Sequence, residues 1–107
     1  MSIVQSLQGM LAKNEIDGLL ISSGINRRYV TGFTGTAGAV LLTEKEALFI
    51  TDFRYTDQAE EQVKACKIVK QSGTLAQEIA KQAKQLNIKR LGFEKKQINL
   101  WRIRAVQ

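Results

Sequence analysis

The chain has 107 residues, of which 44% are hydrophobic and 24% charged, and it contains no proline and no histidine. This length supports one modest hydrophobic core, and the composition is that of a folded domain rather than a disordered segment. Without histidine and with one cysteine, these residues cannot form a Ser-His-Asp triad, a Cys/His pair or a CxxC zinc site.

The formal net charge of +6 is unevenly distributed along the chain. Residues 1–88 carry ten basic and nine acidic side chains, whereas residues 89–107 carry six basic side chains against Glu94 alone. A short basic end is usually a solvated surface. We therefore expect no nucleic-acid partner, and a small basic nucleic-acid-binding protein remains the less favoured alternative.

No apolar run approaches the ~20 residues that a membrane-spanning helix needs, and the first ten residues lack the pattern of a secretory signal. The sequence therefore predicts a cytoplasmic protein with no membrane partner. Cys66 is the only cysteine, which excludes an intrachain disulfide and favours a small buried apolar side chain.

The first predicted elements are a helix, a strand and a hairpin. A capping-box pattern and apolar residues at helical spacing predict a helix over residues 3–13. The apolar run at residues 18–22 is too short for a helix and is typical of a strand buried on both faces. Two further apolar runs, residues 37–43 and 47–52, are separated by a polar triplet and predict a β-hairpin.

Helices and strands also alternate in the second half of the chain. A surface helix is predicted over residues 55–64, a short strand over 67–70 and a helix with a capping box over 74–87. The last strand is predicted over residues 90–94, and residues 98–106 have the pattern of a helix beginning. This order indicates an α/β domain with a mixed sheet of at least five strands.

Three glycines spaced three residues apart, Gly32, Gly35 and Gly38, raise the question of a phosphate-binding loop. Such a loop needs a helix directly after the glycines, whereas the segment after Gly38 has strand character. A KH-type GXXG loop at residues 32–35 would need a following helix and basic residues in the loop. The favoured interpretation is that the glycines allow turns with positive φ before a buried strand.

Two neighbours of the glycines are also candidates for a function. Phe33 is expected to be exposed on this loop, where an aromatic side chain needs a contact partner. Asp52 lies at the end of an apolar strand and is expected to cap the next helix or to pair with Arg54. General acid or base chemistry would need a second titratable group, which the sequence does not indicate.

Residues 23–59 resemble the signature of the amino-terminal domain shared by creatinase, prolidase and aminopeptidase P, and the likeness extends over about residues 1–96. The matching positions are Asn26, Arg28, Tyr29, 31–33, 35–38, 41–43, Thr51, Asp52, Arg54, Tyr55, Gln58 and Ala59. The resemblance implies that residues 1–107 form a single domain. Its expected fold is a three-layer mixed β-sheet of five to six strands flanked by helices, with a ribonuclease H-like motif.

The resemblance implies a non-catalytic amino-terminal domain of an Xaa-Pro dipeptidase or aminopeptidase. In such enzymes a carboxy-terminal domain of the pita-bread fold holds two divalent metals, often manganese or cobalt, and this chain is expected to lack that domain. We therefore expect no catalytic residue, no metal ligand and no activity in this chain by itself. A stand-alone binding module derived from the domain remains an alternative.

The resemblance also implies a homodimer in which this domain helps to form the substrate entrance for short proline-containing peptides. Phe33, Thr34 and Gly35 are then expected to line the entrance of the neighbouring subunit's cleft, with Arg28 or Arg54 contacting a substrate carboxylate. The remaining motif positions have an expected structural role: Asn26, Tyr29, Gly32, Gly38, Asp52 and Tyr55.

Overall fold

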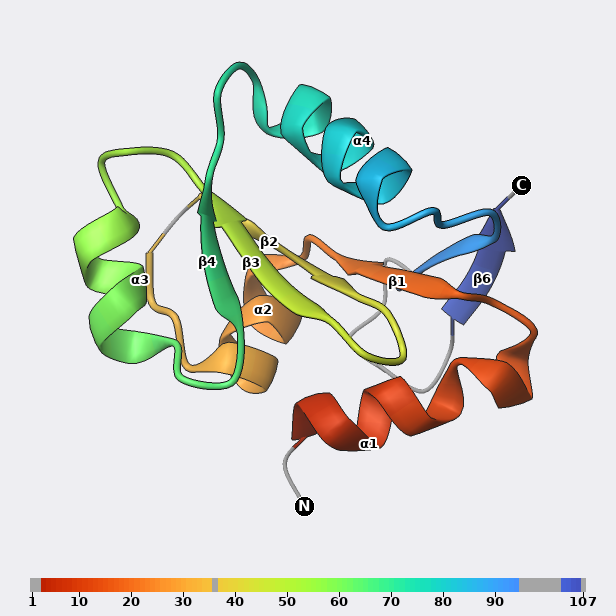
Figure 1. The fold of residues 1–107 in the computed structure, drawn as a ribbon. Coiled ribbons are helices and arrows are strands. Elements are labelled where there is room, and N and C mark those ends of the chain that lie inside the picture. Colours follow the sequence, from red (N-terminus) through yellow and green to blue (C-terminus); the bar gives the residue numbers. More distant parts are fainter. Residues whose placement is uncertain (1–2, 36, 95–102, 107) are drawn as a thin grey trace.

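The computed structural model describes residues 3–35, 37–94 and 103–106 (Figure 1). The helices are α1 (Ile3–Met10), α2 (Gly24–Thr31), α3 (Thr56–Gln62) and α4 (Leu75–Gln85), with a short 3-10 helix η1 (Ala12–Asn14) after α1. The strands are β1 (Gly18–Ile21), β2 (Ala39–Leu42), β3 (Ala47–Thr51), β4 (Lys67–Lys70), β5 (Leu91–Glu94) and β6 (Ile103–Val106).

The strands form one six-stranded mixed sheet in the order β4-β3-β2-β1-β5-β6. β1, β2 and β3 are successive antiparallel neighbours at its centre, with Leu20 opposite Leu41 and Val40 opposite Phe49. β4 and β5 are each added in parallel on the two sides, and β6 closes the far side antiparallel to β5. The predicted mixed sheet of five to six strands is confirmed.

Helices cover both faces of the sheet, as the three-layer prediction requires. α1, α2 and α3 lie on one face and α4 lies on the other (Figure 1). Along β2, Val40 and Leu42 point into the larger core cluster, whereas Leu41 points into the smaller cluster beneath α4. The central strands are apolar at successive positions because each of their faces is covered.

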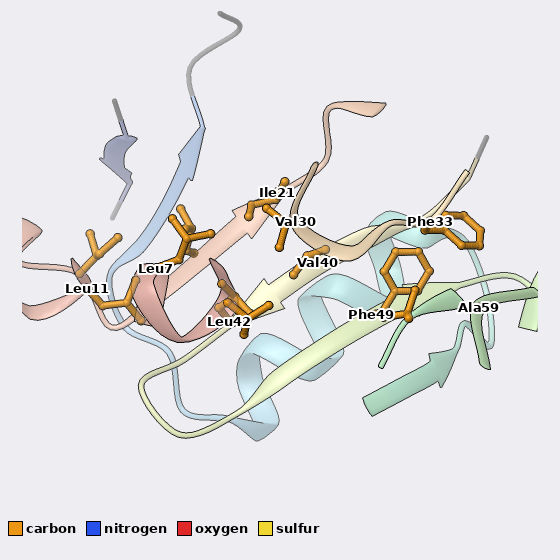
Figure 2. Close-up of a cluster of buried hydrophobic side chains, with 13 residues drawn as sticks. Leu7, Leu11, Ile21, Val30, Phe33, Val40, Leu42, Phe49 and Ala59 are labelled. Carbon is orange, nitrogen blue, oxygen red and sulfur yellow. The ribbon is translucent and has the colours of Figure 1, made fainter. Parts of the chain in front are cut away.

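The larger core cluster joins the three helices of one face to the sheet (Figure 2). It extends from Leu7 and Leu11 at α1 to Phe49 and Ala59 near α3. Cys66 packs against this cluster, and burial raises the pKa of its thiol to about 11. Cys66 is half-buried rather than fully buried as predicted. Its thiol has little thiolate character near neutral pH.

The capping box predicted at the start of α4 is present in the structure. The Thr74 hydroxyl accepts a hydrogen bond from the Gln77 N–H at 3.1 Å, and the Thr74 N–H donates to the Gln77 side chain at 2.9 Å. The helix ends just before Asn87, which has a positive φ of 60°. Both predicted ends are thus explained by capping.

α2 is absent from the predicted elements, although it is a regular helix. Its buried face carries the polar residues Asn26, Arg27 and Thr31 beside Val30, so no apolar periodicity marks it. The caps alone signal it: the Ser23 hydroxyl accepts from the Asn26 N–H, and Gly32 ends the helix with a φ of 80°. A helix with a polar buried face escapes a search for hydrophobic spacing.

The prediction of a helix beginning over residues 98–106 is wrong for residues 103–106, which form β6. β6 pairs antiparallel with β5, so the open edge of β5 receives hydrogen-bond partners. This long-range pairing outweighs local helical preference. Residues 98–102 lie outside the described residues. No helix in the described part of the chain is long and apolar enough to cross a membrane.

Glu78 on α4 is a buried acidic residue that holds the segment before the helix. Its side chain is 2% exposed and accepts hydrogen bonds from the Ser72 N–H at 3.0 Å and the Ser72 hydroxyl at 2.9 Å. The Gln82 side chain donates to its second oxygen at 2.8 Å. The hydrogen bond from Gln82, together with those from Ser72, lowers the pKa of Glu78 below its ordinary value of 4.5.

A Glu78→Gln variant should be less stable than the parent chain at neutral pH and less sensitive to acid. Because the folded-state pKa of Glu78 is lowered, ionised Glu78 stabilises the fold above its ordinary pKa of 4.5, and this contribution is lost as pH falls through the lowered pKa. Urea unfolding at a series of pH values measures the difference. Parallel pH curves for Glu78→Gln and the parent would contradict the assignment, and exposed Glu61→Gln serves as the matched control.

Candidate functional site

The candidate site is the loop that joins α2 to β2 and passes α3, described at residues 32–35 and 37–38 (Figure 1). It contains the three spaced glycines and Phe33. Each end of the loop is set by a glycine, and its middle is held by side chains from α2 and α3.

Gly32 and Gly38 have the positive φ values that the turn interpretation predicts. Gly32 ends α2 with a φ of 80°, and its N–H donates to the Arg28 carbonyl at 2.7 Å. Gly38 has a φ of 149°, and a Cβ there would lie 2.8 Å from the ring of Phe49. β2 begins at the next residue, Ala39. The prediction of turns with positive φ before a buried strand is confirmed for these two glycines. It is wrong for Gly35, which has no positive φ; a Cβ at Gly35 would instead collide with the ring of Phe33. The loop is followed by a strand and not by the helix of a phosphate-binding loop.

Phe33 is buried, so the expectation of an exposed aromatic side chain on this loop is wrong. It is 1% exposed, and its ring centroid lies 4.6 Å from that of Phe49 and 6.0 Å from that of Tyr55. Figure 2 shows the Phe33 ring beside Phe49. The turn at Gly32 brings the chain back over the sheet, where burial of the ring is favourable. The Phe33 side chain therefore supports the loop from the core.

Arg27 holds the loop from α2. Its side chain is 6% exposed, and its two terminal nitrogens donate to three backbone carbonyls. Nη1 donates to Gly38 at 2.9 Å and to Ser22 at 3.3 Å, and Nη2 donates to Gly35 at 3.1 Å. The sequence did not indicate this role, because arginine is ordinarily exposed and α2 itself was not predicted.

Thr34 at the tip of the loop is exposed and is held by α3. Its N–H donates to the Gln62 side-chain oxygen at 3.0 Å, and the Gln58 amide donates to its hydroxyl at 3.0 Å. The loop is therefore fastened on two sides, by Arg27 of α2 and by two glutamines of α3. Gln58 is a matched motif position, and its hydrogen bond to Thr34 was not expected from the sequence.

A shallow hollow of about 420 Å³ lies between the start of α2 and the loop. Its lining residues are Gly24, Ile25, Arg27, Arg28, Phe33, Thr34 and Gly35. The structure thus brings together four of the five residues expected at a substrate entrance. Arg28 is the exposed cation of this hollow. Arg54, the fifth, is not among the lining residues.

Arg54 is engaged in a pair with Asp52, one of the two roles expected for that aspartate. The two side chains form a salt bridge at 2.8 Å, and the Asp52 carboxylate also accepts from the Arg54 N–H at 2.8 Å. The Arg54 guanidinium lies 5.5 Å from the centre of the Tyr55 ring. The side-chain hydrogen bond from Arg54 lowers the pKa of Asp52. These contacts fix the turn between β3 and α3.

The remaining motif residues differ in burial. Asn26 is 1% exposed within the fold, whereas Tyr29 is 60% exposed on the outer side of α2. Ile25, one turn earlier on the same helix, is also 60% exposed. Within the described residues, no three His, Cys, Asp or Glu side chains come together in a way that could hold a metal ion.

The sequence and the fold both match known proteins. Residues 3–107 match the family model of the creatinase/prolidase N-terminal domain. The uncharacterized peptidase YqhT of Bacillus subtilis is 47% identical over 91 residues, which are 85% of this chain and 26% of that protein. This chain therefore spans about a quarter of the length of that relative.

Two solved structures have the same fold. The Xaa-Pro dipeptidase from Bacillus anthracis superposes with a TM-score of 0.81 at 46% identity, over 85% of this chain and 26% of that one. The N-terminal domain of the cytoplasmic peptidase PepQ from Mycobacterium tuberculosis gives a TM-score of 0.77 at 32% identity, over 85% of this chain and 71% of that one. On this evidence the chain belongs to the creatinase/prolidase N-terminal domain family.

Proposed function

We propose that this chain is the non-catalytic amino-terminal domain of a cytoplasmic proline-specific metallopeptidase, an Xaa-Pro dipeptidase or aminopeptidase. The observation that carries the proposal is the match over 85% of the chain to a protein described as an Xaa-Pro dipeptidase. The PepQ relative, which is described as cytoplasmic, supports the compartment. By itself the chain is proposed to be inactive.

The chemistry of bond cleavage is assigned to a carboxy-terminal domain. The described residues of this chain do not fit a metal site, since they offer no cluster of three candidate ligands. The two divalent metals expected in the complete enzyme, manganese or cobalt, are proposed to be held by that carboxy-terminal domain. The proposed role of this domain is to take part in dimerisation and to form part of the entrance through which the peptide reaches the active site.

The hollow beside the loop is the proposed substrate entrance. It joins the exposed cation Arg28 to the polar tip at Thr34 and the backbone of Gly35. Arg28 is favoured over Arg54 as the contact for the carboxylate of a short proline-containing peptide, because the Arg54 guanidinium already binds Asp52 at 2.8 Å. Phe33 contributes by supporting this wall rather than by touching the peptide, because its ring is buried.

Exchanging the aligned segment of the Bacillus anthracis enzyme for this chain allows the entrance to be tested. In that chimera, Arg28→Ala should raise KM for an Xaa-Pro dipeptide about tenfold and leave kcat within about twofold, because a contact made equally before and during reaction affects KM alone. The effect should disappear for the same dipeptide with an amidated carboxyl terminus.

Arg54→Ala is the matched control for this experiment, because it removes an arginine that is already paired. An unchanged KM in Arg28→Ala, or an equal rise in Arg54→Ala, would contradict the proposed carboxylate contact.

We also propose that the complete protein is a homodimer and that the outer side of α2 takes part in the contact. Ile25 and Tyr29 lie one turn apart on this helix, both 60% exposed, and Ile25 lines the hollow. Exposed apolar side chains beside a functional hollow are typical of a protein contact surface.

Sedimentation equilibrium of the chimera tests the dimer. The chimera should be a dimer, and the double variant Ile25→Ser and Tyr29→Ser should raise its dimer dissociation constant about tenfold or more. Phe53→Ser, which replaces an aromatic side chain that is 73% exposed on the turn before α3, is the control. A monomeric chimera, or equal dissociation constants for the two variants, would refute the role of α2.

A further inference from the structure

Arg27 connects the two walls of the hollow. One wall is the first turn of α2, on which Arg27 lies, and the other is the loop, where Arg27 donates to the carbonyls of Gly35 and Gly38 at 3.1 and 2.9 Å. It also donates to the Ser22 carbonyl, just before α2, at 3.3 Å. The Arg27 side chain thus connects Ser22 before α2 with Gly35 in the loop and with Gly38 just before β2.

The Arg27 guanidinium is buried, and this restricts the positions of the carbonyl groups that bind it. A buried guanidinium is tolerated when its donors have partners, because its desolvation is otherwise costly. The planar fork of arginine presents several donors in fixed directions, so each acceptor must stay in place for the side chain to remain buried. The positions of Gly35 and Gly38 are therefore coupled to the orientation of the first turn of α2.

Arg28, the next residue, shares that turn of the helix with Arg27 and faces the solvent side of the hollow. The loop is also fastened from the opposite side by Gln62, which accepts from the Thr34 N–H. Loss of the Arg27 contacts would leave the loop held by the buried Phe33 ring and by α3, but its backbone at Gly35 and Gly38 would no longer be fixed to α2. The expected consequence is a change in the shape of the hollow rather than loss of the core.

We propose that Arg27 is a positioning residue: it fixes the loop against α2 so that the hollow is preformed and Arg28 meets the peptide carboxylate without reorganisation. This inference rests on the proposed function of the hollow. Arg27 itself does not touch the peptide. Preorganisation of this kind improves binding because the cost of ordering the site has been met during folding.

The test uses the same chimeric dipeptidase with Arg27→Gln and Arg27→Lys. Arg27→Gln should raise KM for the free dipeptide about tenfold, with kcat within about twofold and no change for the amidated dipeptide. Arg27→Lys should give a smaller rise, because an ammonium keeps the charge without the planar fork. In the double variant with Arg28→Ala, KM should be no higher than in Arg28→Ala alone, because both act through one contact.

Glu78→Gln is the control for a merely structural role. Glu78 is also buried and charged, and it binds backbone and side-chain partners on the opposite face of the sheet. Its replacement should lower Tm and leave KM unchanged.

Distinct outcomes separate this inference from the proposed function. A folded Arg27→Gln or Arg27→Lys enzyme with parental KM, in a background where Arg28→Ala raises KM, would overturn the role of Arg27 alone. An additive rise in the double variant, or an equal rise for the amidated dipeptide, would do the same. If Arg27→Gln fails to fold, Arg27→Lys decides. An unchanged KM in Arg28→Ala would overturn the proposed carboxylate contact itself.

Discussion

The burial of Phe33 against Phe49 and Tyr55 is the constraint on which the rest of the candidate site depends. Because the ring is placed in the core, the loop that carries it cannot swing away from the sheet. Gly32 allows the chain to turn into this position, and Gly38 lets it leave past the Phe49 ring. Gly32 and Gly38 therefore allow the backbone conformation of the loop, and the ring contacts of Phe33 stabilise it.

With the ring fixed, polar contacts determine the shape of the exposed side of the loop. Arg27 binds its backbone from α2, and Gln58 and Gln62 bind Thr34 from α3. The residues available to a ligand are those that remain at the rim, with Arg28 the exposed cation among them. Within one motif, some residues therefore support the loop, and others remain exposed where a ligand could contact them.

Much of the fold could be predicted because its signals are local. The α4 capping box at Thr74 and the apolar runs of β2 and β3 each indicate one structure irrespective of distant contacts. α2 could not be predicted in this way, because Arg27 and other polar residues occupy its buried face. β6 depends on pairing with β5, which local preference does not encode. The motif singled out the residues of this loop, whereas the burial of Phe33 and the hydrogen bonds of Arg27 became apparent only in the three-dimensional arrangement.

The central claim, that Phe33 is a core residue that holds the loop, is tested most directly by urea unfolding of the chain with Phe33→Ala. We expect a loss of about 3–5 kcal/mol in the free energy of unfolding, typical of truncating a buried phenylalanine. Phe53→Ala, at a position that is 73% exposed, should change this free energy by no more than about 0.5 kcal/mol. Equal, small losses for the two variants would contradict the account, because Phe33 would then be dispensable to the core.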